Sequence, residues 1–380
     1  MDFGFTEEQG LLRQTVRDFI RRECPREYAR EIDEQERYPF DIHKKMAELG
    51  WLGLGIPEEY GGCGGDLLTL VILVEELSRG MLAAGNMLFR NVVNAGFSIL
   101  RNGTEEQKQY FLPRLTKGEL LFAFSLTEPN AGSDAAAIIT SAAKNGNEYV
   151  IDGDKVFCTG AEVADYIQVA TRTNKAVPKH KGISVFLVNT KTPGITLHRV
   201  KKIVNKAMAT SQIFFDQVRV PEGNLLGKLD GGWAAILKTL DFERICVAAM
   251  CLGVTQTVLD DALQYAQERV QFGQPIGKFQ VIQHKLADMK ARLEAARLLT
   301  YRAAWMAQQD MPCTMEASLA KLVASENYVL NSMDGMQILG GYGLTMEYDM
   351  QRFFRDAREF TIGAGTSEIL RNIIARLIGL

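Results

Sequence analysis

The sequence lacks the patterns that would place the protein on a nucleic acid or in a membrane. Its 43 Lys and Arg residues nearly balance 46 Asp and Glu residues, so the net charge at pH 7 is only -3. A basic surface for nucleic acid is therefore not expected. No unbroken run of about 18 apolar residues is present, as a membrane span requires. The first residues also lack the basic and then apolar order of a secretory signal, so we expect a cytoplasmic protein.

Cysteine and histidine are present but form no recognisable metal or redox pattern. The six cysteines include no CxxC pair, and the four histidines are scattered along the chain. Structural zinc sites and thiol-redox motifs both require such closely spaced residues. We therefore expect no metal site, and we expect free thiols that are buried in a reducing compartment.

The hydrophobic pattern changes twice along the 380 residues, which predicts an α+β protein of several domains. Residues 6–120 and the chain from Gly231 onward have apolar residues at helical spacing. Between them, Tyr149–Cys158 predicts two short strands around an Asp-Gly turn, and three β-branched or aromatic runs follow. We expect an N-terminal helical domain (1–120), a middle antiparallel β-barrel (121–230) and a C-terminal four-helix bundle (231–380). The bundle helices are expected at 232–270, 279–309 and 315–339, with a shorter one after Thr366.

Four short motifs occur in a fixed order along this pattern. They are LTEPNAGSD (126–134), RVQFG (269–273), QILGGYG (337–343) and GAGTSE (363–368). The first suits a turn with free backbone N–H groups, although an ordinary Asn-Ala-Gly turn explains it equally well. Arg269 can pair with a phosphate or simply be a solvated arginine favoured by a helix dipole. The Gly340-Gly341 pair permits close approach of a phosphate or merely ends a helix.

Taken together, these motifs closely resemble the acyl-CoA dehydrogenase family over essentially the whole chain. The segment from Pro25 to Pro39 resembles the crotonobetainyl-CoA reductase-like subgroup most. The resemblance implies FAD as cofactor and an acyl-CoA or enoyl-CoA thioester as substrate. It also implies an electron-transfer flavoprotein as redox partner and a role in fatty acid or carnitine-type metabolism.

The resemblance also assigns residues to the cofactor. One set of residues is expected to contact the flavin of its own subunit, and another set is expected to contact the FAD of a neighbouring subunit. The resemblance therefore implies a homo-oligomer, either a dimer or a homotetramer built from two dimers. Phe157 stands where relatives usually have tryptophan, and a phenylalanine can still pack on the ring. The residues assigned to the flavin are Phe124, Leu126, Thr127, Ser133, Phe157 and Thr159. Those assigned to the FAD of the neighbouring subunit are Arg269, Phe272, Gln337 and Gly341. Two further residues assigned to FAD are Thr366 and Glu368.

The catalytic base is the main departure from the common family pattern. Many relatives carry a glutamate immediately before the final Gly-Thr, where this chain has Ala364. Isovaleryl-type relatives instead take the base from another helix, and Leu240–Arg244 matches that segment, so Glu243 is the predicted base. The alternative is a surface glutamate on an amphipathic helix. The backbone N–H of Ala364 can still bind the thioester oxygen.

Substrate contacts are expected from Ser133, Asp241, Arg244 and Ala364, although a structural pair explains Asp241 and Arg244 equally well. The segment Lys202–Ser211 departs from the Gly, Arg or Trp, and Ser pattern of relatives, so a branched, aromatic or polar acyl group is compatible with the sequence. We expect Glu243 to transfer the α-proton while the β-hydride passes to or from the flavin. Two alternatives are a silent structural subunit, suggested by Ala364, and an acyl-CoA oxidase.

Overall fold

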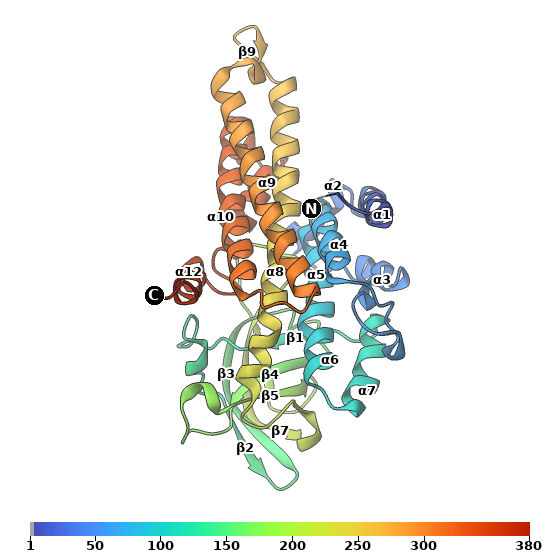
Figure 1. The fold of residues 1–380 in the computed structure, drawn as a ribbon, viewed down its shortest axis with the longest axis vertical. Coiled ribbons are helices and arrows are strands. Elements are labelled where there is room, and N and C mark those ends of the chain that lie inside the picture. The colour runs from blue at the N-terminus through green and yellow to red at the C-terminus, as the bar shows by residue number, and fades with distance from the viewer. Residues whose placement is uncertain (1–3) are drawn as a thin grey trace.

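The computed structural model describes residues 4–380, which begin with a helical region (Figure 1). Thr6 and Gln9 form a capping box, because each hydrogen-bonds the other's backbone at the start of α1. One segment, η3, is a π-helix. The elements are α1 (Glu7–Glu23), α2 (Arg26–Gln35), α3 (Phe40–Glu48), η1 (Trp51–Gly53), η2 (Glu58–Tyr60), α4 (Leu67–Gly80), α5 (Leu82–Phe89), η3 (Arg90–Phe97), α6 (Ser98–Asn102) and α7 (Glu105–Thr116).

A strand-rich region follows and forms one sheet with the order β6-β7-β3-β2-β4-β5-β8, with β1 paired to β4. Strands β4 and β5 are buried along almost their whole length and are rich in β-branched residues, as suits the centre of a sheet. The strands are β1 (Phe122–Ser125), β2 (Ser141–Asn145), β3 (Glu148–Thr159), β4 (Tyr166–Arg172), β5 (Ile183–Asn189), β6 (Ile195–Arg199), β7 (Thr210–Pro221) and β8 (Leu225–Leu226), with short helices η4 (Ala135–Ala137), η5 (Lys179–Lys181) and η6 (Glu222–Asn224) between them.

The sheet differs from the expected antiparallel barrel in two ways. Within the described chain its end strands β6 and β8 do not pair, so the sheet stays open. Strand β8 has only two residues, and the helix that follows it, α8, packs against the neighbouring strand β5. In addition, β1 and β2 both pair with β4 in parallel.

The Asp-Gly sequence at 152–153 is not the expected hairpin turn. Strand β3 runs continuously through it, with a register shift against β7 between Ile151 and Gly153. Gly153 has a φ of 137°, and a β-carbon there would lie 2.7 Å from the Cα atom of Thr140. Glycine is therefore required by a bulge and a close backbone approach, not by a turn.

The chain ends in a helical region whose long members match the expected segments. Helix α11 was not predicted, and α4 of the N-terminal region packs against α8 and α9, so the bundle includes a helix from outside the C-terminal region. The elements are α8 (Gly232–Glu268), β9 (Val270–Gln271), β10 (Gln274–Pro275), η7 (Ile276–Lys278), α9 (Gln280–Gln308), α10 (Thr314–Leu339), η8 (Gly340–Leu344), α11 (Met350–Phe360) and α12 (Ser367–Leu377).

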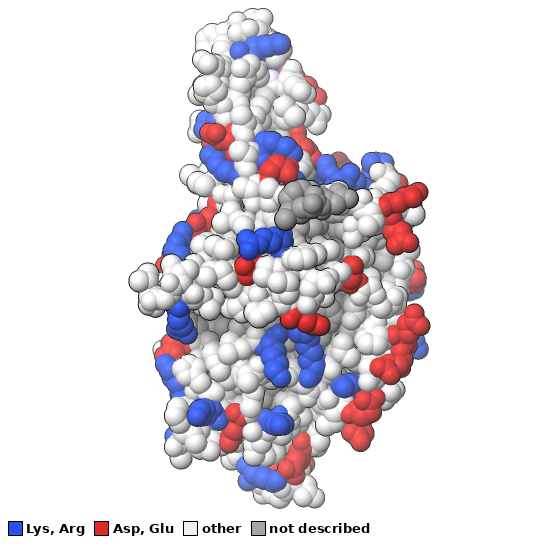
Figure 2. Space-filling view, in the orientation of Figure 1, with Lys and Arg blue, Asp and Glu red and all other residues white. Residues whose placement is uncertain are grey.

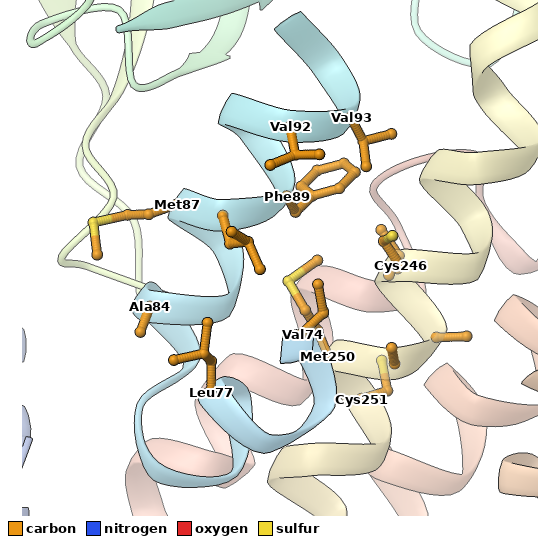
Figure 3. Packing of buried hydrophobic residues seen from close by; sticks show 14 of the residues in the cluster. Val74, Leu77, Ala84, Met87, Phe89, Val92, Val93, Cys246, Met250 and Cys251 are labelled. Carbon is orange, nitrogen blue, oxygen red and sulfur yellow. The ribbon is translucent and has the colours of Figure 1, made fainter. Parts of the chain in front are cut away.

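Helix α8 is the centre of the molecule. Its length and composition alone would suit a membrane span, but 83% of its apolar stretch is buried inside the protein, as in the core helix of a folded domain. Figure 3 shows its residues Cys246, Met250 and Cys251 facing α4, α5 and η3. Five of the six cysteines are buried as expected, whereas Cys63 is exposed.

Candidate active site

A cavity lies where α8 passes beside the sheet and the η3–α6 helical run. Asn94 and Ser98 line it from the helical run, Phe124 from β1, Gln168 from β4, and Thr239 and Glu243 from α8. Gln168 orders this wall, because its amide donates to the Asn94 carbonyl at 2.7 Å and its side-chain oxygen accepts from the Ser98 hydroxyl at 2.8 Å. The cavity therefore joins the sheet to the helix that carries the predicted base.

Glu243 is the carboxylate of this cavity. Burial raises the pKa of Glu243, and the charges of Arg90, Arg244 and Lys321 oppose that rise. Among residues 4–380, no donor bonds to its carboxylate and no cationic nitrogen lies within 4.0 Å. Glu243 is therefore an unpaired carboxylate with a raised pKa, which is the state a general base requires.

The loop that contains Ala364 is linked to the same carboxylate through a buried lysine. Lys321 of α10 is fully buried, donates to the Gly365 carbonyl at 2.7 Å, and interacts electrostatically with Glu243. Ala364 itself has a φ of 54°, in the left-handed region, which costs about 1–2 kcal/mol for a residue with a β-carbon. Such strain is common where a backbone group must point at a ligand.

Asp241 and Arg244 are paired with each other and do not line the cavity. Their side chains are 2.9 Å apart, and Asp241 also accepts from the Thr314 hydroxyl at 2.6 Å. Neither residue lines the cavity that contains Glu243. Their role in substrate binding stays a prediction, and their contacts favour the alternative of a structural pair that joins α8 to the start of α10.

The residues expected around the flavin lie together on β1, the following loop and β3. Val156 donates to the Thr127 carbonyl at 2.9 Å, and the Cys158 thiol lies 3.4 Å from the Phe124 carbonyl. Thr159, at the end of β3, shares a hydrogen bond of 2.9 Å with Thr210. The sheet therefore aligns the strand that carries Phe157 and Thr159 with the start of the 126–134 loop.

A buried ion pair fixes that loop. The Lys155 ammonium lies 2.9 Å from both the Glu128 carboxylate and the Leu126 carbonyl, and Glu128 in turn accepts from the backbone N–H groups of Ile139 and Thr140. Lys155 is 0% exposed. This network holds Leu126 and Thr127 against β3.

The surface beside this loop fits a flat, electron-poor ring. Phe157 is 63% exposed, and its φ of 58° turns it out of the regular strand. No acceptor in the described part of the chain pairs with the backbone N–H of Thr127 or Ser133. An exposed aromatic ring and free N–H donors together suit the stacking and edge hydrogen bonds of an isoalloxazine. Ser133 is itself exposed.

The residues predicted to contact the FAD of a neighbouring subunit do not lie beside the flavin-facing strands. Figure 1 places the β9–β10 hairpin at one end of the molecule and the sheet at the opposite end. The Arg269 guanidinium is 5.6 Å from the Tyr342 ring, so it lies beside the Gly341 turn, while Gln337 is exposed near the end of α10. Phe272, at the hairpin tip, is 94% exposed. Within one chain these residues do not join the flavin-facing strands.

Thr366 and Glu368 lie at the start of α12, directly after the Ala364 loop. The Thr366 side chain accepts from the Ile369 N–H at 3.2 Å and so caps the helix. Glu368 is exposed in the first helical turn, where backbone hydrogen bonding lowers its pKa. Their assignment to FAD stays a prediction.

Several charged residues near the cavity were not identified from the sequence. Arg90 and Lys321 interact electrostatically with Glu243, and Lys202 and Glu359 interact with Arg90. The sequence does contain a pattern that distinguishes two of these residues. Arg90 is the only charged residue in 80–100, and Lys321 is the only one in 317–325. A lone cation inside an apolar helix is rarely placed there by packing alone.

Three family models match the chain. They are described as acyl-CoA dehydrogenase N-terminal, middle and C-terminal domains, and they match residues 6–119, 123–218 and 230–379. The 3-(aryl)acrylate reductase of Clostridium sporogenes is 41% identical over 98% of both chains. The short-chain specific acyl-CoA dehydrogenase of Clostridium acetobutylicum is 40% identical over 99% of both.

Solved structures agree with these matches. Butyryl-CoA dehydrogenase of Megasphaera elsdenii superposes with a TM-score of 0.95 at 37% identity over 100% of both chains. A glutaryl-CoA dehydrogenase in complex with glutaryl-CoA gives 0.96 at 36% identity, over 99% of this chain and 96% of that one. A chain from the structure on the electron transferring flavoprotein of Acidaminococcus fermentans gives 0.96 at 37% identity, with both chains fully covered.

Proposed function

Because the chain belongs to the acyl-CoA dehydrogenase family, we propose that it oxidises an acyl-CoA, or reduces the matching enoyl-CoA, with Glu243 as the base. As a member of that family it is an FAD-dependent oxidoreductase that acts on a CH–CH group. The observation that carries the proposal is the unpaired Glu243 carboxylate in the cavity beside the flavin-facing strands.

The mechanism follows from the residues around this carboxylate. Bound FAD supplies the hydride-accepting or hydride-donating chemistry. Glu243 takes the α-proton from the substrate, and its raised pKa brings the base closer to the working pH. We assign to the Ala364 N–H the hydrogen bond to the thioester oxygen. The positive charges of Arg90 and Lys321, which act on Glu243, also favour the negative charge that develops on that oxygen.

The raised pKa of Glu243 predicts how the rate depends on pH. A base must be deprotonated, so flavin reduction is expected to rise with pH, with its inflection above 4.5, the ordinary value for this side chain. Stopped-flow flavin reduction across a pH series measures it. In Glu243→Gln this inflection is expected to vanish. An inflection at or below 4.5, or one that persists in the variant, would contradict the assignment.

An anaerobic titration tests the proposed function. The purified protein is expected to be yellow, with about one FAD per chain, and to lose its flavin absorbance when a suitable acyl-CoA is added. A folded protein that cannot be loaded with FAD refutes the proposal. A protein that binds FAD but is bleached by no acyl-CoA, and reoxidised by no enoyl-CoA, is the silent subunit. Hydrogen peroxide release in air identifies an oxidase instead.

The partners follow from the two separated groups of cofactor residues. Because Arg269, Gly341 and Phe272 do not meet the flavin-facing strands within one chain, we propose that they bind the FAD of a second subunit in a dimer or dimer of dimers. Figure 2 shows that the hairpin end carries few charged residues on the face in view, as suits an interface. An electron-transfer flavoprotein is the proposed redox partner, supported by the Acidaminococcus match. The link to crotonobetainyl-CoA reductases stays a prediction.

A further inference from the structure

The segment between β6 and β7 is largely buried although it has no regular secondary structure. Residues 200–209 contain neither helix nor strand, yet Asn205, Ala207 and Met208 are buried. A buried backbone of this kind must find partners for its N–H and C=O groups outside any helix or strand. Asn205 also has a φ of 41°, in the left-handed region that is costly for most residues. The shape of this segment is therefore set by its contacts with other elements.

Helix α11 supplies these contacts through two successive residues. The Asp356 carboxyl accepts from the Asn205 N–H at 2.6 Å, and the Arg355 guanidinium donates to the Ile203 carbonyl at 2.6 Å. Arg355 also donates to the Asp33 carboxylate of α2 at 2.7 Å. Because Asp356 bonds the backbone of the residue with the left-handed φ, it fixes the conformation of the segment at its bend.

The same segment leads directly to the end of β3 that faces the proposed flavin site. The Ala209 carbonyl accepts from the Gly160 N–H at 2.7 Å. Thr210 is the first residue of β7, and it pairs with Thr159 both in the strand register and through a side-chain hydrogen bond of 2.9 Å. Phe157 lies in the irregularity of the β3–β7 pairing just before Thr159. A shift of residues 203–209 would therefore move the end of β3 that carries Phe157 and Thr159.

The Asp356 carboxyl is buried and has no cation beside it. It is 4% exposed, and no cationic nitrogen of residues 4–380 lies within 4.0 Å of it. Asp356 also lines a cavity of about 30 Å³, which is large enough for water to reach the carboxyl. Burial raises the pKa of Asp356 to about 7, and the hydrogen bond from the Asn205 N–H opposes that rise. Asp356 therefore changes its charge near neutral pH.

The groups around Asp356 do not reverse the effect of burial. Asp33 raises the pKa of Asp356 further, whereas Arg352 and Arg355 lower it. Arg355 is already bonded to Asp33, and Tyr328 stays uncharged at neutral pH because burial raises its pKa. The charged and titratable groups that surround Asp356 are Asp33 of α2, Lys202 and Lys206 of the irregular segment, Tyr328 of α10, and Arg352 and Arg355 of α11.

We propose that Asp356 is a positioning residue for the flavin, which in its neutral form holds residues 203–210 against the end of β3 and on ionisation loosens this hold. The inference rests on the proposed function, because it places the flavin at Phe157 and Thr159, but it does not depend on Glu243. Asp356 acts through the backbone of Asn205 and does not itself touch the cofactor. The device makes retention of FAD sensitive to pH.

The sign of the pH dependence follows from the raised pKa. A carboxyl that binds its proton more tightly in the held form than in the loosened form stabilises the held form at low pH. That stabilisation is lost as the pH rises from the ordinary value of 3.8 through about 7. The affinity for FAD is therefore expected to fall across this window and to level off above it.

Dilution of the FAD-loaded full chain, followed by flavin fluorescence, measures the dissociation constant across a pH series. For the wild type this constant is expected to rise by about 10-fold between pH 5 and pH 8, as one pKa unit of difference between the two forms requires. Asp356→Asn is neutral at every pH and keeps an oxygen for the Asn205 N–H. At pH 8 it is expected to bind FAD about 10-fold more tightly than the wild type, and its profile should lack the rise.

Asp356→Leu and Glu76→Gln separate positioning from general stability. Leucine offers no acceptor to the buried Asn205 N–H, so the dissociation constant is expected to be about 10-fold higher than for Asp356→Asn at every pH. Glu76 is buried to a similar degree, at 2% exposed, but it pairs with Arg13 and Arg17 of α1. Glu76→Gln is expected to lower the unfolding temperature and to leave the dissociation constant of FAD and its pH profile unchanged.

The outcomes distinguish this inference from the proposed function. If the wild type shows no rise between pH 5 and pH 8, or if Asp356→Asn keeps the same rise, the inference fails while a yellow, FAD-binding protein leaves the function intact. Equal weakening of FAD binding by Glu76→Gln and Asp356→Leu would also contradict it. Should Asp356→Leu not fold, the comparison of the wild type with Asp356→Asn decides the question. A folded wild type that binds no FAD at any pH refutes the proposed function as well.

Discussion

Glutamine in place of Glu243 is expected to slow flavin reduction by at least about 100-fold, because general-base catalysis contributes on that scale. The amide keeps the size of the side chain and most of its hydrogen bonding, but it accepts no proton at neutral pH. FAD content and acyl-CoA affinity should therefore change little. Rapid mixing of the FAD-loaded variant with acyl-CoA under anaerobic conditions measures the rate.

Asp241→Asn is the comparison for this experiment. It removes a carboxylate from the same helix, but one that is paired with Arg244 and Thr314 outside the cavity. A smaller loss is expected than for Glu243→Gln. If Glu243→Gln reduces its flavin at the wild-type rate, or if Asp241→Asn loses more, the base has been assigned to the wrong residue.

Loss of the Glu128 carboxylate is expected to lower the free energy of unfolding by about 3–5 kcal/mol, the usual cost of breaking a buried ion pair. Glu128→Gln leaves the ammonium of Lys155, which is 0% exposed, without its counter-charge. The Leu126–Thr127 segment is held by the same network, so the variant should also retain less FAD. Urea unfolding of the full chain and its flavin content are the two measurements.

The pH dependence of this contribution has a definite sign. Burial alone would raise the pKa of Glu128, but Lys155 and the donors at Thr140 and Ile139 lower it overall. A carboxylate with a lowered pKa in the folded state stabilises the protein above its unfolded pKa. The contribution is therefore present at neutral pH and is lost as the pH falls through the folded pKa.

Glu222→Gln provides a matched control within the same region. Glu222 pairs with Lys144 at 2.6 Å, but both side chains are largely exposed. Exposed pairs contribute at most about 1 kcal/mol, so this variant should be nearly as stable as the wild type. Equal destabilisation by the two glutamine substitutions would contradict the role assigned to the buried pair.

The long helices could be predicted from the sequence because their spacing is a local property. Helix α9 buries residues three or four apart, whereas α8 is buried on all sides from Arg244 to Thr255. The bounds of α8, α9 and α10 fall close to the expected segments. Closure of the sheet is not local, since it depends on which edges meet after folding. The bulge at Gly153 was mistaken for a turn because Asp-Gly favours both, and only the approach of Thr140 distinguishes them.

Some residues of the candidate site belong to local motifs, whereas others are brought together only by the fold. Glu243 and the 126–134 loop could be singled out from the sequence because their motifs are contiguous. Arg90, Lys202 and Glu359 belong to three separate segments, and only the packing of η3, the 200–209 loop and α11 brings their charges together. A lone arginine in an apolar helix signals a buried cation, but its neighbours are unknown until the fold is known.

Proton transfer by Glu243 is tested most directly by hydrogen exchange without redox chemistry. In an acyl-CoA whose β-carbon is replaced by sulfur, hydride transfer is blocked and only the α-proton can move. With FAD-loaded protein in D₂O, mass spectrometry is expected to show α-deuterium incorporation by the wild type and incorporation at least about 100-fold slower by Glu243→Gln. Equal incorporation by both proteins would contradict the account, because the α-proton would then be removed by another group.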